Sequence, residues 1–183
     1  MFGRFILIFG KSGAGKTSLI NGLITLYPLI YCRPISYTTR KKRINESNDE
    51  YQFISKDDLI SLFNKGTILN LDLVYGNYYG IDKKDLINKL NDGKIVIKEI
   101  HPSNFDKIRV AFPDIITIYI DSKKQSIYRD SQRYNEDLAF YNTNNLTCDI
   151  YFQNSYGLSL EKNIVTLHEQ ITNIIHNLGE QNE

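Results

Sequence analysis

The chain has 183 residues, of which 42% are apolar and 23% are charged, and its formal net charge is +1. This composition suits a globular protein with a substantial core, and the length fits one domain. The near-neutral balance argues against a partner chosen by bulk charge, so neither nucleic acid nor an anionic membrane is expected. Cys32 and Cys148 lie far apart and suggest neither a disulfide framework nor a zinc site.

Apolar runs rich in β-branched and aromatic residues predict strands, and amphipathic stretches between them predict helices. The first run is too short for a signal-peptide core or a membrane span, so we expect a buried strand in a cytoplasmic protein. The alternation predicts an α/β fold with a parallel sheet flanked by helices. The expected strands are residues 5–9, 29–32, 94–100, 115–120 and 149–152, and the expected helices are residues 16–27, 83–93, 123–133 and 160–179.

The stretch GKSGAGKTSL, residues 10–19, follows the first expected strand and leads into the first expected helix. It matches the phosphate-binding pattern G-x-x-x-x-G-K-[ST] in the context that this pattern requires. Small residues let backbone N–H groups turn toward phosphate oxygens, Lys16 brings a mobile charge, and Thr17 brings a hydroxyl for Mg²⁺. The stretch predicts a site for ATP or GTP with Mg²⁺, formed by Gly10, Ser12, Gly13, Ala14, Gly15, Lys16, Thr17 and Ser18.

A basic run from Arg40 to Arg43 follows the second expected strand. By itself, such a run most often forms a solvated basic face. Tyrosines nearby favour a second interpretation, since Tyr51 follows the run and YGNYYG stands at residues 75–80. Two arginine forks and two phenolic hydroxyls can close around one phosphate. The sequence therefore predicts a second phosphate site.

Taken in order, GKSGAGKTSL, SYTTRKKR, EYQF, GNYYG, DGKIVIKEI and FPDIITIYI resemble the guanylate kinase family. The resemblance runs from about residue 5 to residue 133, and more weakly through CDIYFQNS at 148–155. It implies a single domain, residues 1–183, with a P-loop NTPase-type sheet, a small inserted mixed α/β lobe for the acceptor nucleotide and a short lid. The implied core is 1–32, 82–128 and 148–183, the lobe is 33–81 and the lid is 129–147.

The same resemblance implies transfer of the ATP γ-phosphoryl group to a nucleoside monophosphate, GMP or dGMP in this family, by a monomer or homodimer whose partners are small nucleotides. It also implies a role for individual residues. The implied catalytic residues are Lys16, Glu99, Arg129 and Arg133, the last two being lid arginines. Glu99 corresponds to a family acid that helps to hold Mg²⁺ through water. The implied acceptor residues are Ser36 near the base and Arg40, Arg43, Tyr51 and Tyr79 around the phosphate.

Three positions of the implied base pocket depart from the family pattern: Asn70 replaces a guanine-reading glutamate, Ile81 replaces a Ser or Thr, and His101 replaces an Asp. A carboxylate only accepts hydrogen bonds and suits the N1–H and N2–H₂ donors of guanine, whereas an amide fits adenine, cytosine, uracil or thymine at least as well. Asp72 lies two residues from Asn70 on the same strand face and offers a replacement carboxylate. The acceptor base, and a pocket or structural role for His101, therefore stay open.

The segment after Arg133 is shorter than in the family, and residues 134–147 contain neither Arg nor Lys. A shortened lid excludes water less well and brings one positive charge fewer to the transition state. Two alternatives to a nucleotide kinase follow: a catalytically weak binding module of the same fold, and a kinase of another phosphorylated small molecule.

Overall fold

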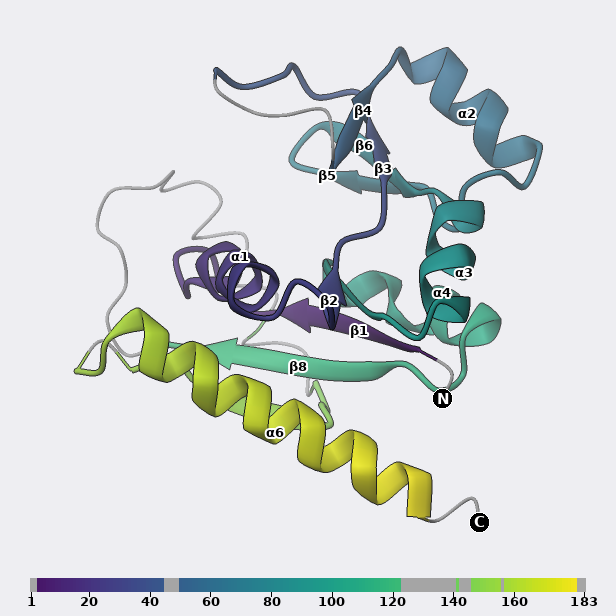
Figure 1. Cartoon of the computed structure of the whole chain (residues 1–183). Coiled ribbons are helices and arrows are strands. Elements are labelled where there is room, and N and C mark those ends of the chain that lie inside the picture. The colour runs from purple at the N-terminus through teal and green to yellow at the C-terminus, as the bar shows by residue number, and fades with distance from the viewer. Residues whose placement is uncertain (1–2, 45–49, 123–140, 142–145, 156, 181–183) are drawn as a thin grey trace. The chain divides into compact units, whose positions relative to one another are not determined.

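The computed structural model describes residues 3–44, 50–122, 141, 146–155 and 157–180. It contains a five-stranded sheet of order β2-β7-β1-β8-β9 and a four-stranded sheet of order β4-β3-β6-β5 (Figure 1). The chain divides into two compact units, residues 1–5 with 32–115 and residues 6–31 with 116–183. Helices flank the larger sheet, so the predicted α/β architecture is confirmed.

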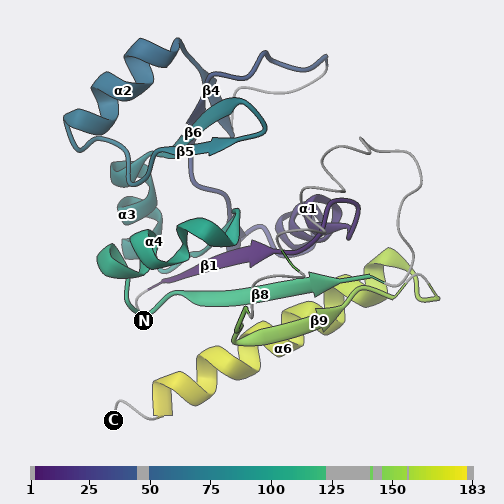
Figure 2. The same ribbon diagram turned by 180° about the vertical axis from the view of Figure 1, so that it is seen from behind.

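The second unit contains most of β1 (Arg4–Phe9) and all of β8 (Ile116–Asp121) and β9 (Ile150–Gln153), which lie next to one another in the larger sheet. β1 pairs in parallel with β8, which pairs in parallel with β9. The helices α1 (Lys16–Leu26) and α6 (Leu160–Glu180) pack on each other beside these strands (Figure 2). Their approach is close, because a Cβ on Gly22 would collide with the side chain of Ile164.

The first unit contains the small mixed sheet. β3 (Ser36–Thr38) runs parallel to β4 (Tyr51–Phe53) and antiparallel to β6 (Asn77–Ile81), and β5 (Asp72–Val74) runs antiparallel to β6. The short strand β2 (Tyr31–Cys32) precedes this sheet, and the remaining elements of the unit are α2 (Lys56–Asn64), α3 (Lys83–Asn91), β7 (Ile95–Glu99), the 3₁₀ turn η1 (Pro102–Asn104) and α4 (Phe105–Ala111).

The expected elements that fall in the described residues appear within two residues of the predicted bounds, and the strand expected from residue 29 begins only at Tyr31. Tyr27 accepts hydrogen bonds from the backbone N–H groups of Ile30 and Tyr31, so a turn occupies this segment and β2 begins at Tyr31. The helices α2 and α4 were not predicted. The expected helix at 123–133 lies outside the described residues. No helix in the described part of the chain is both long and apolar enough to cross a membrane.

Candidate active site

The loop between β1 and α1 has positive φ angles at three of its glycines. Gly10, Gly13 and Gly15 have φ angles of 144°, 83° and 89°, values that side-chain-bearing residues rarely adopt. Gly10 also passes so close to β8 that a Cβ would collide with the carbonyl oxygen of Ile120. The predicted phosphate loop therefore needs glycine at these positions for its own conformation as well as for access to a ligand.

Lys16 begins α1 and its side chain folds back over the loop. The Nζ donates to the carbonyl oxygens of Gly10 at 2.7 Å and Lys11 at 3.0 Å. Thr17 and Ser18 follow in the first turn of α1 and are exposed. The amine, the Thr17 hydroxyl and the start of α1 thus lie on one short stretch, and their contact with an anion stays a prediction.

Asn154 supports the loop through a hydrogen bond to its backbone, and it was not predicted from the sequence. Its side-chain amide donates to the carbonyl of Ala14 at 2.8 Å and lies where a Cβ on Gly15 would be. The residue is buried and comes from the end of β9. Its only signal in the sequence was its place inside CDIYFQNS, the weakest segment of the resemblance.

The small sheet places five of the predicted acceptor residues on one surface, which we call the Ser36 face. Ser36 pairs with Tyr51 and Ile81, and Tyr79 pairs with Thr38 and Asp72. Paired residues, and residues two apart on one strand, point to the same side of a sheet. The Ser36 face therefore carries Ser36, Thr38, Tyr51, Phe53, Asp72, Tyr79 and Ile81.

An aromatic and cationic group occupies the β4 side of the Ser36 face. The rings of Tyr51 and Tyr79 meet edge to face with centroids 6.4 Å apart. The Arg40 guanidinium lies 5.3 Å from the ring centroids of Tyr51 and of Phe53. The structure thus brings together three of the four residues predicted to grip the acceptor phosphate. The fourth, Arg43, lies on an exposed segment, two residues before 45–49, which are outside the described part of the chain.

Asn70 and Asp72 form a buried pair at the β5 side. The Asn70 amide donates to Asp72 Oδ2 at 2.6 Å, and its carbonyl oxygen accepts from the Ile81 N–H at 3.1 Å. Asp72 is only 4% exposed, and its Oδ1 is buried without a hydrogen-bond partner among the described residues. Burial raises the pKa of the Asp72 carboxyl to about 6, although Asn70 and Lys107 act in the opposite direction.

Lys98 is a buried amine in a strand that is otherwise apolar from Ile95 to Ile97. Its Nζ donates to Tyr51 Oη at 3.2 Å and lies 4.4 Å from the centroid of that ring. Burial lowers the pKa of Lys98 to about 8, while Glu50 opposes the shift. Burial also raises the pKa of Tyr51. Sequence reasoning missed Lys98, although a charge inside an apolar strand is a visible signal.

The remaining predicted residues have less specific surroundings. His101 caps η1, since its Nδ1 accepts from the Ser103 N–H at 3.4 Å and lies 2.8 Å from the Ser103 hydroxyl. This geometry favours the structural one of its two predicted roles. Ile81 is 2% exposed, and Glu99 ends β7, directly after Lys98. Arg129 and Arg133 lie outside the described residues.

The oxygen atoms near the loop suit Mg²⁺ that is held mainly by substrate phosphates and water. Among the described residues, no three His, Cys, Asp or Glu side chains gather where they could hold an ion. Mg²⁺ keeps several waters and binds through one or two protein oxygens together with substrate phosphates. A hydroxyl such as that of Thr17, beside a loop with the phosphate-binding sequence pattern, fits this mode without a carboxylate cage.

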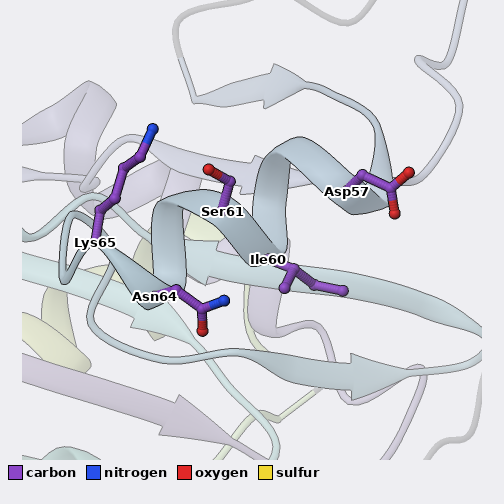
Figure 3. A pocket seen from close by; sticks show the side chains of 5 residues that line it. All are labelled: Asp57, Ile60, Ser61, Asn64 and Lys65. Carbon is purple, nitrogen blue, oxygen red and sulfur yellow. The ribbon is translucent and has the colours of Figure 1, made fainter.

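A shallow hollow on the small-sheet unit is unrelated to these residues. It lies along α2, and its side chains come from successive turns of this one helix (Figure 3). None of the predicted site residues lines it. The lining residues are Asp57, Ile60, Ser61, Asn64 and Lys65.

Comparison with known sequences identifies a family for this chain. A family model described as guanylate kinase matches residues 2–178. The guanylate kinase of Trichormus variabilis is 36% identical over 119 residues, which cover 64% of this chain and 59% of that protein. The guanylate kinase of Helicobacter pylori is 31% identical over 128 residues, covering 69% and 62%. The chain thus spans less than two thirds of the length of these relatives.

Solved structures agree on the fold. A guanylate kinase from Anaplasma phagocytophilum superposes with a TM-score of 0.70 at 20% identity, covering 96% of this chain and 86% of that one. A gluconokinase from Sinorhizobium meliloti superposes with a TM-score of 0.52 at 13% identity, covering 100% and 99%. These matches confirm the α/β P-loop kinase-type fold.

Proposed function

We propose that this chain, which belongs to the guanylate kinase family, transfers the γ-phosphoryl group of ATP to a nucleoside monophosphate, giving ADP and a nucleoside diphosphate. One observation supports the proposal above the others. The unit with residues 6–31 has a loop with the phosphate-binding pattern and the positive φ angles that its glycines allow. The unit with the small sheet has a group of Arg40, Tyr51 and Tyr79 that suits a second phosphate. Phosphoryl transfer between two nucleotides needs these two anion sites and no covalent intermediate.

The loop residues bind the donor. Backbone N–H groups of residues 13–18 surround the phosphates, and the Lys16 amine leaves the Gly10 and Lys11 carbonyls for the group in transfer. When Mg²⁺ is bound, the Thr17 hydroxyl would hold it, and Glu99 is the acid that the family resemblance assigns to it through water; the ion would supply positive charge for the donor phosphates. Arg129 and Arg133 add positive charge as the transition state forms. These roles go with the cytoplasmic setting expected from the sequence, in which ATP is available.

The acceptor base is read by Asp72, with Asn70 as its orienting partner. The Asn70 amide is fixed at both ends, by Ile81 and by Asp72. Asp72 Oδ1 is a buried acceptor with no partner among the described residues. Acceptor-only chemistry matches the adjacent N–H donors of guanine. GMP and dGMP are therefore the proposed acceptors, in spite of the amide at position 70.

The test combines the protein with ATP, Mg²⁺ and each common ribo- and deoxyribonucleoside monophosphate, and measures ADP. GMP or dGMP should give the highest kcat/KM. D72N should lower that value by about 100-fold, because a buried donor replaces an acceptor. D57N, on exposed α2, is the matched control. ATP binding without turnover of any acceptor by folded protein would reject the proposal in favour of a binding module, and turnover of another phosphorylated compound alone would reject the nucleotide.

A further inference from the structure

We propose that Lys98 is a positioning residue for the acceptor phosphate: its ammonium donates to Tyr51 Oη and so turns the Tyr51 hydroxyl hydrogen toward that phosphate. The inference rests on the proposed function, because it assigns to Tyr51 the contact with the acceptor. The inference adds to the acceptor site one residue, Lys98, that contacts neither the donor nor the acceptor. The contact belongs wholly to the unit that contains the small sheet.

The direction of the hydrogen bond follows from its two groups. A lysine ammonium has only donors, so at 3.2 Å the Tyr51 oxygen must accept. The phenol has one hydrogen, which then points away from Lys98. Accepting a bond from a cation also polarises the O–H and makes it a stronger donor. A tyrosine held in this way presents a fixed donor to an anion.

Lys98 is poorly explained as a purely structural residue. The carboxylate oxygen Glu50 Oε1 lies 3.9 Å from the Lys98 Nζ and is already bound by Arg33 at 3.0 Å. Such a distant pair offsets little of the cost of burying an ammonium, and an apolar side chain of similar size is usually at least as stable. The other charged or titratable groups around Lys98 are Glu99 and Tyr79. The position fits a role in the chemistry of the Ser36 face.

The direct test uses inorganic phosphate as the probe and protein carrying ¹³C at tyrosine Cζ. The Tyr79 resonance, assigned with Y79F, reports phosphate that arrives at the Ser36 face rather than at the loop. K98M should weaken phosphate binding about fivefold to tenfold. In a Y51F background, K98M should add no further weakening. K98R keeps a donor and should recover much of the affinity.

K56M is the matched control. Lys56 also lies over a tyrosine, with Nζ 5.0 Å from the Tyr78 ring centroid, but Tyr78 alternates with Tyr79 and points to the opposite face of β6. K56M removes the same charge from the same unit and should change phosphate affinity less than twofold. A K98M effect of equal size with and without the Tyr51 hydroxyl would overturn the inference, because Lys98 would then act on phosphate directly. The inference would also be overturned if K98M left phosphate affinity unchanged, or if the Tyr79 ¹³C resonance did not shift when phosphate was added.

Turnover separates this inference from the proposed function. In the kinase assay, K98M should raise the KM for the acceptor by the same factor and leave kcat within about twofold. If no acceptor is phosphorylated but the coupling between Lys98 and Tyr51 is present in the phosphate titration, the proposed function fails, and Lys98 positions Tyr51 for a phosphate that is not a kinase acceptor. K98M should also melt no lower than the wild type, since a structural role would predict the reverse.

Discussion

Asp72 is expected to reduce stability at neutral pH, and D72N tests this directly. Burial raises the pKa of its carboxyl from 3.8 to about 6 in the folded chain. Between these values the folded state binds more protons than the unfolded state, so stability must fall as the pH rises through this window and level off above about 6. The full difference corresponds to about 3 kcal/mol of stability lost once Asp72 is charged.

Urea unfolding between pH 4.5 and 8 measures the effect. About 2 kcal/mol of the loss develops within that range, because part of it is already present at pH 4.5. The stability of D72N relative to the wild type should therefore rise by about 2 kcal/mol between these two pH values. The comparison cancels any constant cost of the new amide. D57N removes an exposed carboxyl from α2, and its curve should run parallel to that of the wild type. A D72N difference that does not change with pH would refute the reasoning.

Three further substitutions test other parts of the structure. K16M removes the amine that bridges Gly10 and Lys11 and should lower kcat at least about 100-fold in the ADP assay; near-normal turnover would contradict the role of Lys16. N154A leaves the Ala14 carbonyl unpaired and should lower the free energy of unfolding by about 1–3 kcal/mol while raising the KM for ATP; unchanged urea curves would count against it. H168A removes a ring stacked on Tyr27 at 3.9 Å and a 2.7 Å bond with Tyr31 and should cost about 2 kcal/mol with kcat unchanged, because the group lies at the opposite end of α1 from the loop; a large loss of turnover would be unexpected.

The phosphate loop could be predicted from the sequence because its requirements are local. Glycine at positions 10, 13 and 15 is dictated by positive φ angles within six residues, and the strand and helix on either side have clear patterns. The four strands of the small sheet are three to five residues long, too short for a periodic pattern to fix their bounds. The helix α2 was missed although its N-cap Ser55 and the acidic first-turn residues Asp57 and Asp58 were visible in the sequence.

The contacts of the supporting residues could not be predicted because they join parts of the chain that are far apart in the sequence, although Lys98 itself was visible as a charge inside an apolar strand. Asn154 meets Ala14 from 140 residues away, and Lys98 meets Tyr51 from 47 residues away. Neither contact leaves a local pattern. The sequence predicted that Asn70 and Asp72 are neighbours on one face. It did not predict that the hydrogen bond between them fixes the amide, or that it leaves one Asp72 carboxylate oxygen without a partner among the described residues.

The Ser36 face has a hydrogen-bond acceptor at its β5 side and hydrogen-bond donors and positive charge at its β4 side. Asp72 lies on β5 and Tyr51 on β4, with β6 and β3 between them, a separation of three strand spacings or about 14 Å. A buried carboxylate on one side and a buried ammonium with two phenols on the other both lower stability in the absence of a ligand. A nucleoside monophosphate has hydrogen-bond donors on its base and a dianion at its other end, so it complements both sides at once. If this arrangement exists for such a ligand, D72N and K98M should each raise stability at neutral pH while impairing use of the acceptor. A variant that lost stability and acceptor affinity together would instead mark its residue as part of the structural core.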